Sequence, residues 1–315
     1  MAAAPVVAQV IRSGFVESVH RGSVAFTGPD GALTRRIGDV AAPVLPRSSN
    51  KPLQGVAMVR AGLRLDPKLL ALACGSHSGE SFHLDGVRRI LAHAGLSEAD
   101  LQNTPDLPYD EQERQEWIVA RRAPQPVAQN CSGKHAGMLA ACVAAGWDTS
   151  GYLDPGHPLQ QLMTRTLEEL AGEQVAAVGV DGCGAPVMSL SLSGLARAFG
   201  RLASATPGTP EGMVADAIRA APQWLGGSRR DVTALILGIP GLVAKDGAEA
   251  VYAAGMADGR GVALKIADGG SRARPVVMAA ALRSMGVESP ALDELAHAPV
   301  LGHGEPVGAV VAVGL

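Results

Sequence analysis

The sequence predicts an α+β fold in which strands from both termini form one antiparallel sheet and helices pack on it and beside it. Strand-type alternation and turn residues occupy the first forty residues and return after about residue 240. From Lys51 to about Ala221, apolar residues instead recur at spacings of three and four. We find no internal repeat and no convincing linker. We therefore expect a single domain over residues 1–315, with a helix-rich middle at about 51–221.

The N-terminal strands are predicted from β-branched and aromatic residues in short runs. Gly28-Pro29-Asp30-Gly31 is a strong turn sequence that separates the last two of these runs. The predicted strands are residues 6–12, 15–18, 23–27 and 32–37.

The helices of the middle region are predicted from apolar residues three and four apart, which line one side of a helix. They are residues 53–61, 67–74, 81–94, 138–145 and 158–171, and small residues make 203–210 a loop. Toward the C-terminus we expect strands at 242–244, 250–254, 261–266 and 307–313, with one helix at 275–285 among them.

Composition narrows the class of partner. A net charge of −3, a pI near 6.2 and 3% aromatic residues do not favour nucleic acid or an acidic membrane surface. No apolar run approaches the roughly 18 residues that span a bilayer, and the N-terminus does not have the pattern of a signal peptide. We therefore expect a cytoplasmic protein that acts on a small polar molecule. In a reducing compartment its four cysteines are expected to be thiols or metal ligands rather than disulfides.

Lysine is rare in this chain. Of 27 basic residues only five are lysines, at 51, 68, 134, 245 and 265. Arginine keeps its proton at any ordinary pH, whereas a desolvated lysine can act as a neutral base or ligand. Each lysine is therefore a candidate for chemistry. Lys68 has the setting of an ordinary surface charge and Lys265 that of a strand residue.

The first candidate motif, Arg47-Ser48-Ser49-Asn50-Lys51-Pro52, stands before a predicted helix. Proline suits the first turn of a helix, and residues three apart share one side of a helical turn. A lysine without its proton could activate Ser48 as a nucleophile, and the helix N-terminus favours developing negative charge. The spacing matches the Ser-x-x-Lys signature of penicillin-binding proteins and β-lactamases. The alternative is that Ser48 only caps the helix.

The second motif is the segment 74–80, in which Ser76, His77 and Ser78 lie between two glycines. Glycine allows a tight backbone and the close approach of a ligand. The hydroxyls could orient a substrate amide or supply a second nucleophile. The alternative is that a serine caps the next helix and His77 is solvated.

The third motif is the strand end Ala244-Lys245-Asp246-Gly247, which resembles the Lys-Thr-Gly element beside acyl-serine hydrolase sites. Here the alternative is an exposed hairpin lysine. The fourth pairs Cys131 and Cys183 with a third ligand, Lys134 or His135, in an open tetrahedral zinc site. Two buried structural cysteines are the alternative there, and Cys74 and Cys142 are expected in the core.

Taken together, these segments resemble the rhizobial-type (class 3) L-asparaginase, or asparaginase II, family over essentially the full length. The motifs Arg-Ser-x-x-Lys-Pro, Ser-His-Ser, Asn-Cys-Ser-Gly-Lys-His-x-Gly-Met and Asp-Gly-Cys occur in the expected order. The chain departs from the family at Gly75 and Gly184, where other members often carry Ala and Asn.

The resemblance implies a fold similar to glutaminases and serine β-lactamases, and a homodimer. It also implies two catalytic pairs, Ser48 with Lys51 and Ser76 with Lys245. Zinc would be held by Cys131, Lys134 and Cys183. The substrate-binding residues are expected to be Arg47, His77, His135 and Asp181.

The resulting hypothesis is an asparaginase in which Lys51 deprotonates Ser48 for attack on the side-chain carbonyl of L-asparagine. Zinc would orient substrate or stabilise the pocket rather than supply the nucleophile. One rival is a β-lactamase-like or peptidase-like acyl-serine hydrolase acting on another amide. The other rival is a non-catalytic relative that binds zinc or a ligand.

Overall fold

The computed structural model describes residues 4–315, which divide into two compact units, each assembled from separate stretches of the chain. Among the described residues, unit 1 comprises residues 4–49, Leu190–Ser204 and Ala234–Leu315, and unit 2 comprises Asn50–Ser189 and Ala205–Thr233. Compactness alone does not define a domain that folds by itself. The single catalytic domain expected over residues 1–315 therefore stays a prediction.

Unit 1 is built on an eight-stranded antiparallel sheet that joins the two ends of the chain, as predicted. Its order is β11-β12-β1-β2-β10-β9-β8, with β3 beside β2. Val10 pairs with Val310 and Ala25 with Ala263, so N-terminal strands lie between C-terminal ones. The strands are β1 (Val6–Arg12), β2 (Phe15–Thr27), β3 (Leu33–Ile37), β8 (Val243–Asp246), β9 (Val251–Gly255), β10 (Gly261–Ile266), β11 (His297–Gly302) and β12 (Glu305–Ala312).

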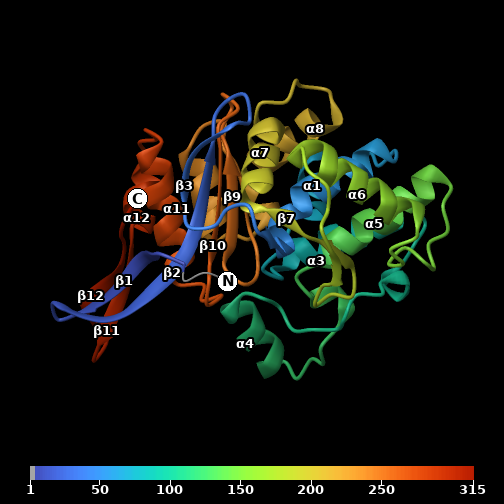
Figure 1. Cartoon of the computed structure of the whole chain (residues 1–315). Helices are drawn as coiled ribbons and strands as arrows, with labels where there is room; N and C mark the ends of the chain where they lie inside the picture. The colour runs from blue at the N-terminus through green and yellow to red at the C-terminus, as the bar shows by residue number, and fades with distance from the viewer. Residues whose placement is uncertain (1–3) are drawn as a thin grey trace. The chain divides into compact units, whose positions relative to one another are not determined.

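Helices cover this sheet on both faces, with α7 (Leu192–Ala203) on one side and α11 (Ala273–Ser284) on the other (Figure 1). The short α12 (Pro290–Leu295) packs beside α11. Helix α7 approaches the strands closely because they carry glycine there. A Cβ at Gly255 or Gly261 would collide with the carbonyls of Phe199 and Ala196. Strands β8 and β9 are consequently buried along their whole length.

Unit 2 is mainly helical. Helix α1 packs against α5, α6 and α8, and α2 packs against α5, α8 and α9. The helices are α1 (Lys51–Arg60), α2 (Pro67–Ala73), α3 (Ser81–His93), α4 (Glu111–Val119), α5 (Ser132–Ala145), α6 (Pro158–Ala171), α8 (Pro210–Ala220) and α9 (Pro222–Leu225). A small hairpin of β5 (Val178–Val180) and β6 (Pro186–Met188) completes it, and α10 (Asp231–Gly238) crosses the division between the units.

The sequence of α6 explains where this helix begins and where it ends. Pro158 occupies the first turn, where its missing N–H costs nothing, and the His157 ring accepts a hydrogen bond from the Leu159 N–H. Gly172 ends the helix in the left-handed conformation that glycine adopts most readily. Leu159, Met163 and Leu167 form its buried face. Truncating one of these to alanine would cost about 2–5 kcal/mol.

Several boundaries differ from the sequence-based expectations, each for a physical reason. Strand β2 runs unbroken from 15 to 27 because the polar stretch between the two predicted strands also pairs with β1. Helix α5 begins at Ser132 rather than 138, since its first turn is buried although it is not apolar. Strand β11 was not predicted because it contains Pro299. The sheet tolerates this proline because β11 is an edge strand. The predicted loop at 203–210 is confirmed between α7 and α8.

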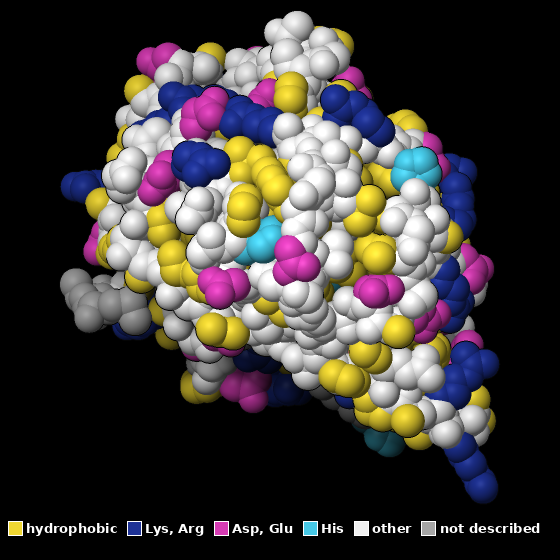
Figure 2. Space-filling model, turned by 90° about the vertical axis from the view of Figure 1, so that its right-hand side faces the viewer, with side chains coloured by type: hydrophobic (Ala, Val, Ile, Leu, Met, Phe, Trp, Pro, Cys, Tyr) yellow, Lys and Arg dark blue, Asp and Glu magenta, His cyan; other side chains and the backbone are white. Residues whose placement is uncertain are grey.

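The short strand β4 (Pro43–Val44) of unit 1 pairs with β7 (Leu190–Ser191) and leads into the 3-10 turn η1 (Arg47–Asn50). This turn carries the first candidate motif and continues directly into α1. Among residues 4–315, no helix is both long enough and apolar enough to cross a membrane. On the face shown in Figure 2, basic and acidic side chains are interspersed, which is ordinary for a chain of net charge −3.

Candidate active site

The candidate nucleophile, Ser48, lies on the η1 turn of unit 1. The preceding residue, Arg47, has a φ of 52°, in the left-handed region that a non-glycine residue seldom adopts. Such backbone strain is concentrated at functional sites, where the surrounding structure holds it in place. Ser48 is partly exposed, while its neighbour Ser49 is buried and donates a hydrogen bond to the Pro46 carbonyl at 2.7 Å. Of the two serines, Ser48 is therefore the one accessible for chemistry.

The strand end that carries Lys245 lies against this turn within unit 1. A Cβ at Gly247 would stand 2.6 Å from the Pro46 carbonyl oxygen and 3.4 Å from the Ser48 nitrogen. Only glycine fits there without displacing the turn. Lys245 is 0% exposed, so the alternative of an exposed hairpin lysine is wrong.

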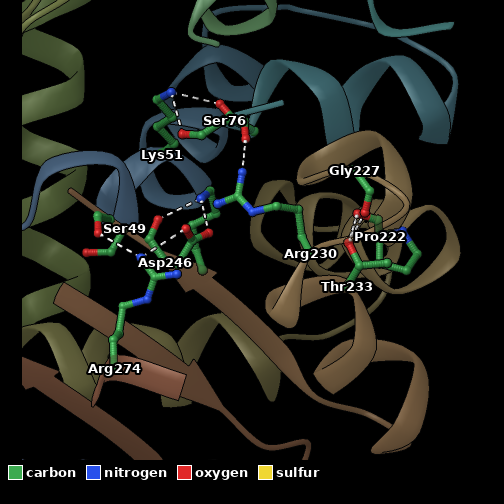
Figure 3. Close-up of polar contacts among 12 residues, drawn as sticks. Ser49, Lys51, Ser76, Pro222, Gly227, Arg230, Thr233, Asp246 and Arg274 are labelled. Carbon is green, nitrogen blue, oxygen red and sulfur yellow. Dashed lines mark hydrogen bonds and ion pairs between the residues drawn. The ribbon is translucent and has the colours of Figure 1, made fainter. Parts of the chain in front are cut away.

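The ammonium group of Lys245 is paired with a carboxylate. Its Nζ lies 2.7 Å from Asp246 Oδ1 and donates to the Asp246 carbonyl at 2.6 Å. Arg274 places Nη1 3.4 Å from the other oxygen of Asp246 (Figure 3). Because desolvating a lone charge is costly, this pairing explains how a lysine can be buried here.

In unit 2, Lys51 is the first residue of α1 and is 1% exposed. Its Nζ donates to the Gly75 carbonyl and to Ser76 Oγ, both at 2.8 Å (Figure 3). It also lies 3.0 Å from Cys131 Sγ. None of these acceptors is a carboxylate. An amine in contact with a hydroxyl and buried from water has the geometry for proton exchange with that hydroxyl.

The structure thus shows a serine–lysine contact, between Lys51 and Ser76, that the sequence had not indicated. The predicted pairs were Ser48 with Lys51 and Ser76 with Lys245. Each of those pairs has one member in unit 1 and one in unit 2. Those two pairs stay predictions. The contact of Lys51 with Ser76 is observed directly, because both residues lie in unit 2.

Beside Lys51, the two candidate metal-binding thiols interact with each other. A hydrogen bond with Cys183, together with the positive charges of Lys51 and Lys134, lowers the pKa of Cys131 well below its usual range. The same hydrogen bond and burial raise the pKa of Cys183. Of the two, Cys131 is therefore the thiol that ionises more readily. Cys74 and Cys142 are buried, and burial raises their pKa values to about 12 and about 11, as expected for core thiols.

Lys134 completes this group, with its Nζ 3.4 Å from Cys183 Sγ. Burial of Lys134 lowers its pKa, but its electrostatic interactions with the thiols of Cys183 and Cys131 outweigh burial and the net shift is upward. The amine therefore holds its proton more tightly than an ordinary lysine. A metal bound here would have to displace that proton.

The donor set of Cys131, Lys134 and Cys183 nevertheless fits zinc, which prefers sulfur and nitrogen ligands. Next along the chain, the Nε2 atom of His135 is buried without a hydrogen-bond partner, a polar atom that a metal or its water could satisfy. No cluster of three or more His, Cys, Asp and Glu able to hold a metal ion occurs in the part of the chain from residue 4 onward. Zinc at this group therefore depends on the lysine and stays a proposal.

Two buried histidines belong to the same region. His77 is 0% exposed and contacts Ser132 Oγ through Nε2 at 2.8 Å, so the alternative of a solvated His77 is wrong. His135 contacts the Tyr152 hydroxyl through Nδ1 at 2.8 Å. Burial lowers the pKa of both rings well below the usual value, so both are neutral at physiological pH.

The structure also excludes the alternative that Ser48 or Ser78 is the N-cap residue of the helix that follows it. The N-cap position of α3 is Glu80 and that of α1 is Asn50, each without a side-chain capping bond. Neither Ser78 nor Ser48 therefore caps its helix. Asp181, a predicted substrate-binding residue, is partly exposed at the start of the turn that carries Cys183, and its charge acts to raise the pKa of Lys134.

Sequence reasoning missed three residues in these groups. Asp246 is part of the third motif, but the sequence of that motif did not show that its carboxylate would pair with the ammonium group of Lys245. Ser132 lay in another motif as a spacer, yet it holds His77. Arg230 contacts the carbonyl of Ser76 with Nη1 at 3.4 Å, and one arginine among 22 gave no signal.

Comparison with known proteins agrees with the motifs. The family model described as L-asparaginase II matches residues 8–312. No curated protein matches this chain.

Among solved structures, a β-lactamase from Mycobacterium bovis is similar, at 14% identity over 84% of this chain and 95% of that one, with a TM-score of 0.48. A Bacillus glutaminase matches at 12% identity over 84% of this chain and 91% of that one, with a TM-score of 0.38. The native form of a protein named Mglu matches at 13% identity over 85% of this chain, which spans 62% of the length of that protein, with a TM-score of 0.47. These likenesses are too distant to support an argument about this chain.

Proposed function

The chain belongs to the L-asparaginase II family, and on that premise we propose that it hydrolyses the side-chain amide of L-asparagine to L-aspartate and ammonia. Family membership supports an amide-hydrolysing enzyme. The observation that carries the proposal is Lys51, a buried amine hydrogen-bonded to a serine hydroxyl without a carboxylate among its contacts. A lysine in that setting can give and take protons, which a serine nucleophile requires.

In the proposed reaction, Lys51 takes the proton of Ser48 Oγ, and that oxygen attacks the side-chain carbonyl carbon. The resulting C–O bond replaces the C–N bond, and the departing nitrogen receives a proton from the protonated lysine and leaves as ammonia. A water molecule then attacks the aspartyl ester, returns a proton to Ser48 and releases L-aspartate. Ser76, which contacts Lys51, and Lys245, which is paired with Asp246, would support these proton transfers.

The backbone at η1 and the start of α1 supports the charged stages of this sequence. N–H groups at the beginning of a helix have no partner within the helix and favour negative charge. Losing one donor to such an oxyanion typically costs about 10²–10³ in rate. Arg47, His77, His135 and Asp181 are the side chains we propose to contact the substrate.

Zinc at Cys131, Lys134 and Cys183 would supply a Lewis-acidic centre that orients substrate or stabilises the pocket. The serines provide the nucleophile in either case. We also propose a cytoplasmic location, which agrees with four free cysteines, and a homodimer, which rests on likeness to the family.

The test is ammonia release from L-asparagine, L-glutamine and a chromogenic β-lactam, each with and without a chelator. We expect release from L-asparagine, and at most a partial loss when metal is removed. Hydrolysis of the β-lactam without release from asparagine would favour the other acyl-serine hydrolase. Binding of zinc or amino acid with no hydrolysis at all would favour the non-catalytic relative.

A further inference from the structure

A hollow of about 590 Å³ lies on unit 2, lined by residues at the start of α2 and at the end of α3. Its lining carries two arginines and a histidine, Arg64, Arg89 and His93, against one carboxylate, that of Asp66. The chain as a whole has a net charge of −3, so this basic surface is a local feature. A hollow of this volume is large enough to hold a small molecule.

The first arginine is held by backbone carbonyls. Arg64 Nη1 donates to the carbonyl of Leu63 at 2.9 Å and to the carbonyl of Val59, in the last turn of α1, at 3.0 Å. These two bonds account for both N–H groups of Nη1 and fix the plane of the guanidinium. The Nε and Nη2 donors form another edge of the group, which can bind a carboxylate through two parallel hydrogen bonds. Among residues 4–315, no carboxylate of the chain pairs with Arg64.

The second arginine is linked to the acid of the hollow. Asp66 Oδ1 accepts a hydrogen bond from the Leu69 N–H as the N-cap of α2, and Asp66 Oδ2 lies 3.2 Å from Arg89 Nη2. Both oxygens of Asp66 are therefore engaged, one by the helix and one by Arg89. A single hydrogen bond leaves Arg89 with further N–H donors. Since an ion pair between exposed side chains contributes little, Arg89 can bind an added carboxylate while it stays beside Asp66.

The rest of the lining suits the hydrocarbon part of a small acid. Leu65, Leu69 and Ala92 are apolar, and Leu69 is 5% exposed. Methylene groups that lie on such side chains lose contact with water, which favours binding. His93, in the last turn of α3, adds a ring nitrogen that can form a hydrogen bond. The hollow thus combines apolar surface with arginines that belong to two different segments of unit 2.

From this arrangement, we infer that the hollow is a binding site for a small dicarboxylate, with one carboxylate on Arg64 and the other on Arg89. Arg64 lies in the loop between α1 and α2, whereas Arg89 lies on α3. Because the two arginines come from different segments around a roomy hollow, they match two separate carboxylates better than one compact anion. The inference goes beyond the proposed function. That reaction would convert a monocarboxylate into a dicarboxylate, so a site of this kind would favour its product over its substrate.

Calorimetric titration of succinate, a dicarboxylate without an amide, into the full chain tests this inference. The wild type should bind succinate, and Arg64→Gln and Arg89→Gln should each bind it at least about 10-fold more weakly, the loss of one charge-assisted interaction. Arg88→Gln is the matched control and should leave the affinity unchanged. Arg88 precedes Arg89 on α3, but it pairs with Asp85 and Glu98 instead of lining the hollow. Acetate, at equal ionic strength, should bind at least about 10-fold more weakly than succinate because it reaches only one arginine.

Arg64→Lys keeps the charge and should restore part of the affinity that Arg64→Gln loses. Because Arg64 is not bonded to Asp66, Arg64→Gln should keep the melting temperature of the wild type, and it decides the result even where Arg89→Gln loosens α2. The inference is overturned if the wild type does not bind succinate, if Arg64→Gln binds it as tightly as Arg88→Gln does, or if inorganic phosphate binds more tightly than succinate. Succinate releases no ammonia, so these outcomes leave the proposed function untouched, and a wild type that binds succinate but releases no ammonia from L-asparagine overturns only the proposed function.

Discussion

Each unit of the molecule contains one candidate catalytic lysine that is buried, and these two lysines, Lys245 and Lys51, differ in the groups that they contact. Lys245 in unit 1 is paired with the carboxylate of Asp246, which Arg274 also approaches. Lys51 in unit 2 contacts a carbonyl, a hydroxyl and a thiol. A carboxylate holds an ammonium group in its charged form, whereas a serine hydroxyl in contact with an amine is a group with which the amine can exchange a proton. The comparison teaches that the neighbours of a buried lysine, more than its burial, decide whether it can act as a base.

The largest effect is expected at Lys51. Lys51→Arg keeps a positive charge but cannot release its proton, so kcat for ammonia release should fall by about 10²–10⁴. Lys245→Arg is the matched control, and because Lys245 already sits in an ion pair we expect a much smaller loss. Equal losses in the two variants would show that the comparison does not hold.

The second prediction concerns stability. Lys245→Met removes the ammonium group that lies 2.7 Å from the buried carboxylate of Asp246 and should lower the free energy of unfolding by about 3–5 kcal/mol. Adding Asp246→Asn removes the negative charge and should recover part of that loss. Denaturant titration measures both, and a double variant no more stable than Lys245→Met would contradict the ion-pair account.

The third prediction concerns the close approach of the two motifs in unit 1. Gly247→Ala places a Cβ against the turn that carries Ser48 and should lower kcat by about 10², the effect of a shift of roughly 1 Å in a catalytic group. Thermal denaturation should show only a modest decrease in stability. Unchanged turnover would indicate that the position of this turn does not matter for the reaction.

The sequence was most informative where local signals decide the structure. Proline at the start and glycine at the end fixed α6, and strand β10 was located by its apolar run between glycine and polar residues. Strand β11 was not predicted, because a proline such as Pro299 is acceptable only in an edge strand. Whether a strand lies at the edge is a property of the whole sheet and cannot be read from the local sequence.

The candidate site likewise has features that the local sequence shows and features that only the fold brings about. The serine and lysine motifs could be read from residue type and spacing. The contact of Lys51 with Ser76 joins residues 25 positions apart, and the ion pair of Lys245 depends on a side-chain direction. Arg230 lies far from every motif in sequence and is brought to Ser76 only by the folding of unit 2.

The smallest predicted effect concerns pH. Burial lowers the pKa of His83 to about 4, from the 6.5 of an unperturbed ring. Between these values the unfolded chain binds a proton that the folded chain does not, so stability rises with pH across this window. His83→Gln keeps a donor for the Gln223 carbonyl and should reduce the change in unfolding free energy between pH 5 and pH 6 by about 1 kcal/mol. An unchanged pH dependence would show that His83 titrates normally.

The proposed nucleophile is tested most directly by ammonia release from L-asparagine in Ser48→Ala and Ser49→Ala. The two residues are adjacent, but Ser48 is partly exposed and Ser49 is buried against Pro46. We predict that Ser48→Ala lowers turnover by at least about 10³-fold with an unchanged melting temperature, whereas Ser49→Ala keeps most of the activity. Full turnover by Ser48→Ala would contradict the account.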